Sequence, residues 1–169
     1  MIKVDLWGPA RAGEHAAEVY QIYDKIFGDQ PDQSVWRTDM YDRHRARDGF
    51  RLSLAHDDSA LVGFAWGYLG ERGQFWSDFV VSAVPDVAED WVGGHFEFVE
   101  LAVLDSHRRR GVGVRLHDRL LEGVSADRAL LGTDNDETSP AVRLYQSRGW
   151  SKLGELNPQT QLMGIHLHQ

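Results

Sequence analysis

Three arginines and two glycines lie close together near the centre of the chain. The run Arg108, Arg109, Arg110, Gly111, Val112, Gly113 follows a β-prone stretch from His95 to Leu104 and opens a helical pattern. At such a junction, free backbone N–H groups and the positive end of the helix dipole meet guanidinium donors. The glycines matter because a Cβ would hold an anion away from those N–H groups. The segment therefore predicts an anion site suited to a pyrophosphate.

Two common nucleotide motifs do not fit this run. A P-loop needs a lysine followed by serine or threonine after its second glycine, and no such pair follows Gly113. A Rossmann fingerprint needs a third glycine three residues after the second, where this chain has Leu116. A basic helix start whose glycines serve only tight packing is the structural alternative to an anion site.

Hydrophobic periodicity predicts the elements before this junction. We expect a strand over residues 2–7, a helix over 19–27 and a second helix from Ser34, as its N-cap, to about residue 46. Alternating apolar residues predict a hairpin over 50–69. Residues 71–94 are rich in acidic and aromatic side chains and predict a loop with one or two helical turns.

The chain after the junction alternates helices with strands. Gly111 opens one helix, and Pro140 suits the first turn of another, which Ser139 or Thr138 would cap and Gly149 would end. The first of these helices has a predicted inner face formed by Val114, His117, Leu121 and Val124. The predicted strands are 129–133, 150–156 and 161–167. This order indicates an α/β or α+β fold with helices on the faces of a sheet.

Composition and charge limit the class of protein. The chain has 169 residues, 42% hydrophobic and 26% charged, which predicts one soluble globular domain over residues 1–169. A net charge of -8 disfavours nucleic acid and anionic membranes and favours cationic partners. The lack of cysteine excludes disulfides, thiolate metal ligands and an acyl-cysteine intermediate. The first residues lack the basic n-region and the apolar core of a signal peptide, and no apolar stretch has membrane-spanning length, so we expect a cytoplasmic protein.

Two spaced motifs together resemble the GNAT acetyltransferase superfamily. The run from Arg108 to Gly113 is similar to the acetyl-CoA motif of that family, R/Q-x-x-G-x-G/A, inside the segment 97–124. A second motif, N-x-x-A-x-x-L-Y followed by G-F/W, resembles residues 138–150, with Thr138 in place of asparagine. The resemblance implies an α/β (α+β) fold with a mixed, mostly antiparallel central sheet of about six to seven strands and about four flanking helices.

The resemblance also implies an activity, an acetyl-CoA dependent N-acetyltransferase in which a primary amine attacks the thioester directly. Acetyl-CoA is the implied cofactor and acetyl donor. Its pyrophosphate would bind at the arginine and glycine run, and its pantetheine arm would pair with the backbone of the fourth strand. The implied cofactor-binding residues are Leu101, Ala102, Val103, Arg108, Arg109, Arg110, Gly111, Val112, Gly113, Val114, Thr138, Ala141 and Leu144.

Three residues are candidates for catalysis. Tyr145 resembles the family tyrosine that protonates the sulfur of coenzyme A. The acceptor ammonium must also lose a proton to a base before the amine can attack, and a carboxylate within an apolar strand would have its pKa raised toward neutrality. Glu100 resembles a glutamate of small-molecule members, and Glu97 resembles the base of protein-lysine members. We favour Glu100 and keep Glu97 open, since a β-bulge would change which face of the strand each one occupies.

The resemblance implies an acceptor pocket built from the first helices and the loop before the fourth strand. The aromatic and acidic residues of these segments suit a cationic or aromatic amine. We expect the acceptor to be a small-molecule primary amine. The alternatives are a protein or peptide N-terminal acetyltransferase and a non-catalytic acyl-CoA binding or sensing module. We expect no metal, because the eight histidines lack the spacing of metal ligands, and a monomer or homodimer. The predicted pocket residues are Trp36, Trp76, Phe79 and Trp91.

Overall fold

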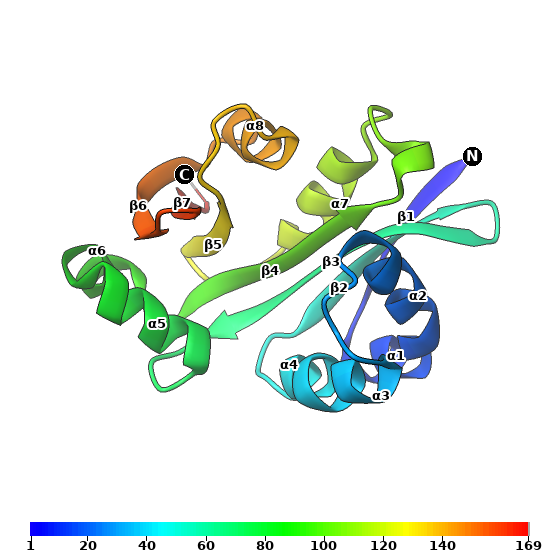
Figure 1. The fold of residues 1–169 in the computed structure, drawn as a ribbon, viewed down its shortest axis with the longest axis horizontal. Coiled ribbons are helices and arrows are strands. Elements are labelled where there is room, and N and C mark those ends of the chain that lie inside the picture. The colour runs from blue at the N-terminus through cyan, green and yellow to red at the C-terminus, as the bar shows by residue number, and fades with distance from the viewer. Residues whose placement is uncertain (169) are drawn as a thin grey trace. The chain divides into compact units, whose positions relative to one another are not determined.

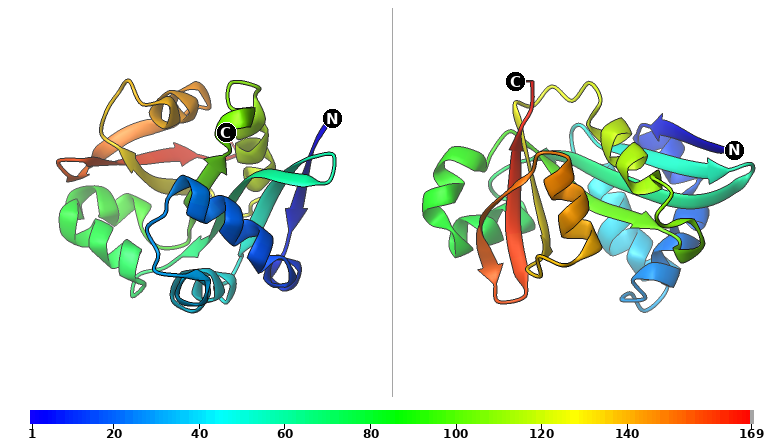
Figure 2. Two further views of the ribbon diagram at one scale, coloured as in Figure 1. Left: turned by 45° about the vertical axis from the view of Figure 1, so that its right-hand side comes forward. Right: turned by 90° about the horizontal axis from the view of Figure 1, so that it is seen from above.

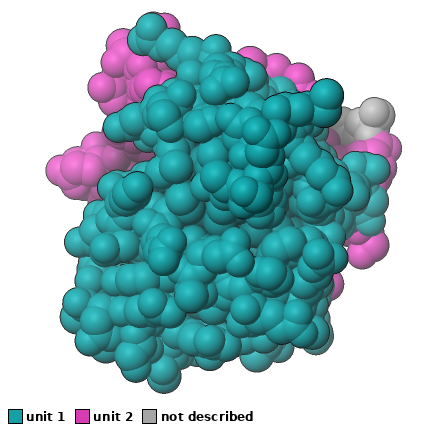
Figure 3. Space-filling model, turned by 90° about the vertical axis from the view of Figure 1, so that its right-hand side faces the viewer, with its two compact units in different colours: residues 1–68, 100–123 teal, residues 69–99, 124–169 magenta. Residues whose placement is uncertain are grey.

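The computed structural model describes residues 1–168 and divides into two compact units, coloured separately in Figure 3. Unit 1 consists of residues 1–68 and 100–123, and unit 2 consists of residues 69–99 and the chain from residue 124 onward. The strands form a seven-stranded sheet in the order β1-β2-β3-β4-β5-β7-β6. Strands β3 (Ala60–Gly70) and β4 (His95–Val103) each contribute residues to both units. The mixed sheet predicted from the sequence is confirmed.

Unit 1 is built on an antiparallel meander. β1 (Ile2–Trp7) pairs with β2 (Arg51–Asp57), and β2 pairs with β3 through the turn that holds Asp58. Asp58 has a φ of 54°, the left-handed conformation that tight hairpin turns require. The predicted strand over 2–7 and the predicted hairpin are therefore confirmed.

Helices lie on both faces of the strands of unit 1. The segments α1 to α4 lie on one face and α7 (Val112–Leu121) lies on the other, as Figures 1 and 2 show. The first set comprises α1 (Pro9–Glu14), α2 (Ala16–Ile26), α3 (Gln33–Trp36), a π-helical turn (Arg37–Tyr41) and α4 (Asp42–Arg45). The core on this side is aromatic, with Tyr23, Trp36, Tyr41 and Trp66 in mutual ring contact and nearly inaccessible to solvent.

Unit 2 contains the parallel pair of the sheet. β4 pairs with β5 (Arg128–Asp134) in parallel, and β7 (Thr160–His166) pairs antiparallel with both β5 and β6 (Ser151–Asn157). Its helices are α5 (Phe75–Ala83), α6 (Pro85–Trp91) and α8 (Pro140–Ser147). One core of this unit joins α5 and α6 to the sheet, through Val80, Ala88, Val92, Leu130, Leu156 and Leu162.

Four sequence-based predictions differ from the structure. Residues 71–94 form the two helices α5 and α6 rather than a loop, because apolar residues such as Val80 and Ala88 find a core that local sequence does not reveal. The second helix is capped by Asp32, whose carboxylate accepts from the backbone N–H of Val35, and not by Ser34. The buried residues of α7 are Val112, Leu116, His117 and Leu120, so of the predicted inner face His117 is confirmed, and Val124 is buried just after the helix, whereas Val114 and Leu121 are only half-buried. The helices also outnumber those the resemblance implied, partly because the second predicted helix is divided by a π-helical turn.

Candidate active site

The arginine and glycine run of unit 1 connects β4 to α7. A 3-10 turn, η2 (Asp105–His107), ends β4, and Gly111 is the N-cap of α7 with a φ of 76°. Apart from Gly111 itself and the adjoining parts of the chain, no heavy atom of the described residues lies within 4 Å of the position that a Cβ of Gly111 would occupy. The side chains of Arg108, Arg109 and Arg110 are exposed. We call residues 108–114 the cradle; its open N-terminal helix turn and three cations fit a pyrophosphate.

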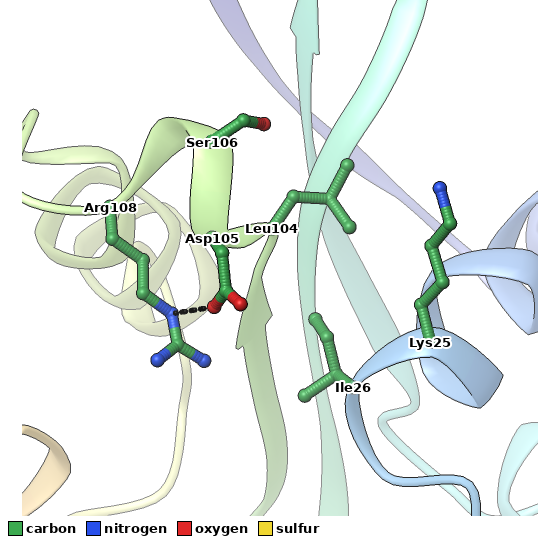
Figure 4. A pocket seen from close by; sticks show the side chains of 6 residues that line it. All are labelled: Lys25, Ile26, Leu104, Asp105, Ser106 and Arg108. Carbon is green, nitrogen blue, oxygen red and sulfur yellow. Dashed lines mark ion pairs between the residues drawn. The ribbon is translucent and has the colours of Figure 1, made fainter.

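A cavity of about 590 Å³ lies in unit 1 beside the cradle, between the end of α2 and the end of β4 (Figure 4). It is lined by Lys25, Ile26, Leu104, Asp105, Ser106 and Arg108. The guanidinium of Arg108 lies 3.2 Å from the carboxylate of Asp105 and donates to the carbonyl of Val103 at 3.3 Å. These contacts orient the first arginine of the cradle along the end of β4.

Glu100 lies in the part of β4 that belongs to unit 1, with its side chain half-buried. Loss of solvation raises the pKa of Glu100 to about 8, and the negative charge of Asp29 acts in the same direction. Asp29 accepts a hydrogen bond of 2.8 Å from the hydroxyl of Tyr23, whose pKa is raised by burial and by the charge of Glu100. The sequence did not point to Asp29 or Tyr23, because only the fold brings them into electrostatic contact with Glu100.

The strand residues after Glu100 differ in exposure. Ala102 is buried, whereas Leu101 and Val103 are half-buried. Gly63 of β3 approaches this segment closely, because a Cβ there would lie 2.8 Å from the carbonyl oxygen of Ala102. The backbones of β3 and β4 therefore lie close together at the position where the resemblance implied the pantetheine arm.

Glu97 belongs to unit 2 and lies in its interior, 4% exposed. One of its carboxylate oxygens lies 3.4 Å from the hydroxyl of Ser77 and 3.4 Å from Nε2 of His95. His95 Nδ1 accepts from the backbone N–H of Gly93, so the neutral ring carries its proton on Nε2 and donates it toward Glu97. Glu97 thus belongs to a buried polar group that the sequence did not predict.

Tyr145 lies on α8 in unit 2 and is 7% exposed. Its ring packs edge-on against Phe98 at 5.8 Å and against Trp150 at 5.9 Å between centroids. The backbone carbonyl of Tyr145 also accepts from the N–H of Trp150, which follows the predicted left-handed Gly149. On the same helix Leu144 is half-buried and Ala141 is exposed. The orientation of the Tyr145 ring is therefore fixed by aromatic packing.

Thr138 lies in the loop before α8. Its hydroxyl donates to the carboxylate of Asp136 at 2.7 Å, and its backbone N–H donates to the same oxygen at 2.9 Å. These two bonds lower the pKa of Asp136. Thr138 therefore shapes the turn that leads into α8, and Ser139 rather than Thr138 is the N-cap of the helix.

The four aromatic residues predicted to line an acceptor pocket lie in different surroundings. Trp36 belongs to unit 1 and is fully buried in the aromatic core. Trp76, Phe79 and Trp91 belong to α5 and α6 of unit 2. Phe79 is 39% exposed, and Trp91 packs on the ring of His166 at 4.5 Å between centroids.

Comparison with known proteins identifies the family. A sequence model described as the acetyltransferase (GNAT) family matches residues 16–150, a range that includes both motifs and most of the elements described above. The chain belongs to this family. GCN5-like protein acetyltransferase Rv2170 of Mycobacterium tuberculosis is 36% identical over 104 residues, which cover 57% of this chain and 50% of that protein. The chain thus spans about half the length of this curated relative.

Solved structures share the GNAT fold along nearly the whole chain. An acetyltransferase from Thermus thermophilus superposes with a TM-score of 0.69 at 15% identity, covering 99% of this chain and 97% of that chain. The ribosomal-protein-S18-alanine N-acetyltransferase from Escherichia coli gives a TM-score of 0.65 at 12% identity, covering 100% and 96%. The NatC complex bound to Gag peptide and CoA gives 0.66 at 15% identity, covering 98% of each chain.

Two further properties of the GNAT chain concern metals and membranes. Within residues 1–168, no group of three or more His, Cys, Asp or Glu side chains is arranged to hold a metal ion. Over the same residues, no helix combines the length and the apolar character needed to cross a bilayer.

Proposed function

We propose that this GNAT chain is an acetyl-CoA dependent N-acetyltransferase that acts on a primary amine. The observation that carries the proposal is the cradle: a left-handed Gly111 with open space around it at the start of α7, preceded by three exposed arginines. The match to the GNAT family over residues 16–150 supports the same activity. Acetyl-CoA would supply the activated acetyl thioester.

The cradle is proposed to bind the donor through its pyrophosphate. The first turn of α7 offers N–H groups without intrahelical acceptors, and the helix dipole favours an anion there. Arg109 and Arg110 add cations that can donate to phosphate oxygens, while Val112 anchors the turn in the core at 1% exposure. Leu101, Ala102 and Val103 would present backbone groups to the donor. By the family motif, Thr138, Ala141 and Leu144 would also contact it.

Glu100 is the proposed base. A carboxyl group with a pKa of about 8 is close to the operating pH, which is the condition under which a general base accepts a proton most effectively. It would take the proton from the acceptor ammonium, directly or through water. Glu97 remains the second candidate, although its carboxylate is engaged with Ser77 and His95.

Tyr145 is the proposed acid. Its hydroxyl would hold the proton that the departing thiolate needs, as the family motif implies. Aromatic packing on Phe98 and Trp150 limits the positions that this hydroxyl can take, which lowers the entropic cost of proton transfer.

We propose a small cationic amine as the acceptor. A second cavity of unit 1, of about 620 Å³, has a volume typical of small-molecule sites. Its lining includes an aromatic ring, aliphatic side chains, two carboxylates and one lysine, contributed by Tyr20, Ile22, Leu61, Glu18, Asp24 and Lys25. A protein acceptor is the second candidate, favoured by the name of the mycobacterial relative, a protein acetyltransferase.

Calorimetric titration with acetyl-CoA tests the donor site. Gly111→Trp would fill the cradle and should abolish micromolar binding. Gly123→Trp is the matched control, because Gly123 has a φ of 74°, lies in equally open surroundings and follows the other end of α7. Equal binding by both variants, or no binding by the wild type, would remove the proposed function. A panel of small amines and lysine peptides, followed by thiol release, then separates the two acceptor classes without background, since the chain has no cysteine.

A further inference from the structure

His107 precedes the cradle by one residue, and both of its ring nitrogens are engaged. Nδ1 lies 2.8 Å from the hydroxyl of Ser106, and Nε2 lies 2.8 Å from a carboxylate oxygen of Asp57. The His107 side chain is 16% exposed. A histidine so bound has no ring nitrogen left to reach a phosphate oxygen, and it is not a freely solvated loop residue.

The contact with Asp57 joins two turns that are 50 residues apart in the sequence. Asp57 ends β2 at the hairpin turn, and His107 ends η2. The same hairpin holds the end of β4 by a second bond, since the N–H of Leu104 donates to the carbonyl of Val62 at 2.9 Å. The start of the cradle is therefore fastened to the β2–β3 hairpin at two points.

The cradle contains a residue whose backbone needs such support. Arg109 has a φ of 63°, a left-handed conformation that costs free energy for any residue with a Cβ. Strained conformations persist only where surrounding contacts impose them. His107 lies two residues before Arg109 and is the last residue of the turn η2. Its hydrogen bond to Asp57 constrains the direction in which the chain enters the cradle.

We propose that His107 and Asp57 form a clamp that holds the cradle in its donor-binding shape, with His107 as a positioning residue for acetyl-CoA. This inference rests on the proposed function, because it assumes that the cradle binds the donor. The clamp lies among several charges: the amino group of Met1 is 3.4 Å from Asp57, Asp58 follows in the hairpin turn, and Asp105 is paired with Arg108. Neither clamp residue was predicted from the sequence to have this role.

The direction in which one substitution changes the affinity for acetyl-CoA distinguishes a clamp from a purely electrostatic effect. Asp57→Asn removes a negative charge near a site for an anion, so electrostatics alone predicts tighter donor binding. A clamp predicts weaker binding, since the amide is a poorer acceptor for His107 and the cradle loses its support. Asp58→Asn is the matched control: it removes the same charge from the adjacent residue, which is 88% exposed and forms an ion pair with the Met1 amine.

We would measure acetyl-CoA affinity by calorimetry for the wild type, Asp57→Asn, His107→Ala, the double variant and Asp58→Asn. We expect affinity about tenfold weaker in each single clamp variant, no further loss in the double variant, and unchanged or slightly tighter binding in Asp58→Asn. The KM for acetyl-CoA should rise accordingly while kcat stays near the wild-type value, a split that a general loss of structure would not give. Tighter binding by Asp57→Asn, or additive losses in the double variant, would overturn the clamp. A wild type that does not bind acetyl-CoA would instead overturn the proposed function.

Discussion

The proposed role of Glu100 as the base depends on where its carboxyl group lies. Loss of solvation is the larger cause of its raised pKa, and the charge of Asp29 is the second. If Glu100 is the base, kcat/KM should increase with pH and level off above about 8, because only the ionised carboxylate accepts a proton. Asp29→Asn removes the second cause, so the inflection should move to lower pH in a rate profile that extends to either side of this value.

Two variants check this interpretation of Glu100. Glu100→Gln should lower kcat/KM by about a hundredfold or more and abolish the inflection, which is the usual effect of losing a general base. Glu97→Gln, the matched change in the other candidate, should leave the inflection in place. A profile that keeps its inflection in Glu100→Gln and loses it in Glu97→Gln would transfer the role to Glu97.

Tyr145 offers a second test at a single atom. Tyr145→Phe keeps the ring and its edge-on packing against Phe98 and Trp150 and removes only the hydroxyl. We expect kcat to fall by about a hundredfold with the affinity for acetyl-CoA preserved, as is typical when a general acid is lost. Steady-state rates give kcat and calorimetric titration gives the affinity for acetyl-CoA of the same variant. Unchanged turnover would argue that another group protonates the thiolate, and absence of turnover in the wild type would favour the binding-only module.

Single residues were predictable where a motif fixes their spacing and were not predictable where tertiary contacts define them. Gly111 and Tyr145 follow from linear motifs, and the structure places Gly111 in the left-handed conformation that an N-terminal anion site uses. Asp29 lies 71 positions before Glu100, and Asp57 lies 50 positions before His107. No local pattern marks such pairs, because their interaction exists only once the strands and helices have packed.

At the scale of elements, the close approach of β3 to β4 near the cradle carries a prediction for stability. A Cβ at Gly63 would lie 2.8 Å from the carbonyl oxygen of Ala102 and 3.0 Å from Leu116 Cδ1, and a backbone oxygen cannot move away without shifting its strand. Gly63→Ala should therefore lower the free energy of unfolding by about 1–3 kcal/mol, as overpacking does. Chemical denaturation measures this change.

The control for Gly63 is another strand glycine with room for a methyl group. The Cβ of a Gly132→Ala variant would meet its nearest neighbours, Leu156 and Trp76, at 3.5 Å, which is ordinary van der Waals contact. We expect it to be neutral or slightly stabilising. Equal destabilisation by both substitutions would show that loss of glycine in a strand, and not the contact with Ala102, determines the cost.

Elements were predictable from the sequence wherever one period dominates. The strands β1, β2 and β3 and the helices α2, α7 and α8 lie close to their predicted ranges, because alternating or helical apolar patterns mark them. The pair α5 and α6 was missed. Acidic residues and exposed aromatics, including Phe75 at 83% exposure, obscure the apolar face that packs on Leu130 and Leu162. The predicted face of α7 was wrong in part: His117 and Val124 are buried as predicted, but Val112 and Leu116, and not Val114 and Leu121, enter the core.

Each of the two compact units is made of two separate stretches of the chain. The chain passes from one unit to the other at residues 68–69, 99–100 and 123–124, and the first two passages lie inside β3 and β4. A strand gains stability from its ladder of hydrogen bonds, so a break within β3 or β4 would weaken the ladders on which both units depend. We therefore expect the two units to unfold as one cooperative domain, as predicted from the chain length.

Scanning calorimetry with and without acetyl-CoA tests this cooperativity together with the donor site. A ligand that binds only the native state at one hundred times its Kd stabilises it by about 2.7 kcal/mol. For a chain of this size, that raises Tm by roughly 5–10 °C. We expect one transition whose calorimetric and van't Hoff enthalpies agree and which shifts as a whole in the wild type and in Gly123→Trp but not in Gly111→Trp. If the units were independent, two transitions would appear and the donor would move chiefly the one that belongs to unit 1, because the cradle residues 108–114 lie entirely within it.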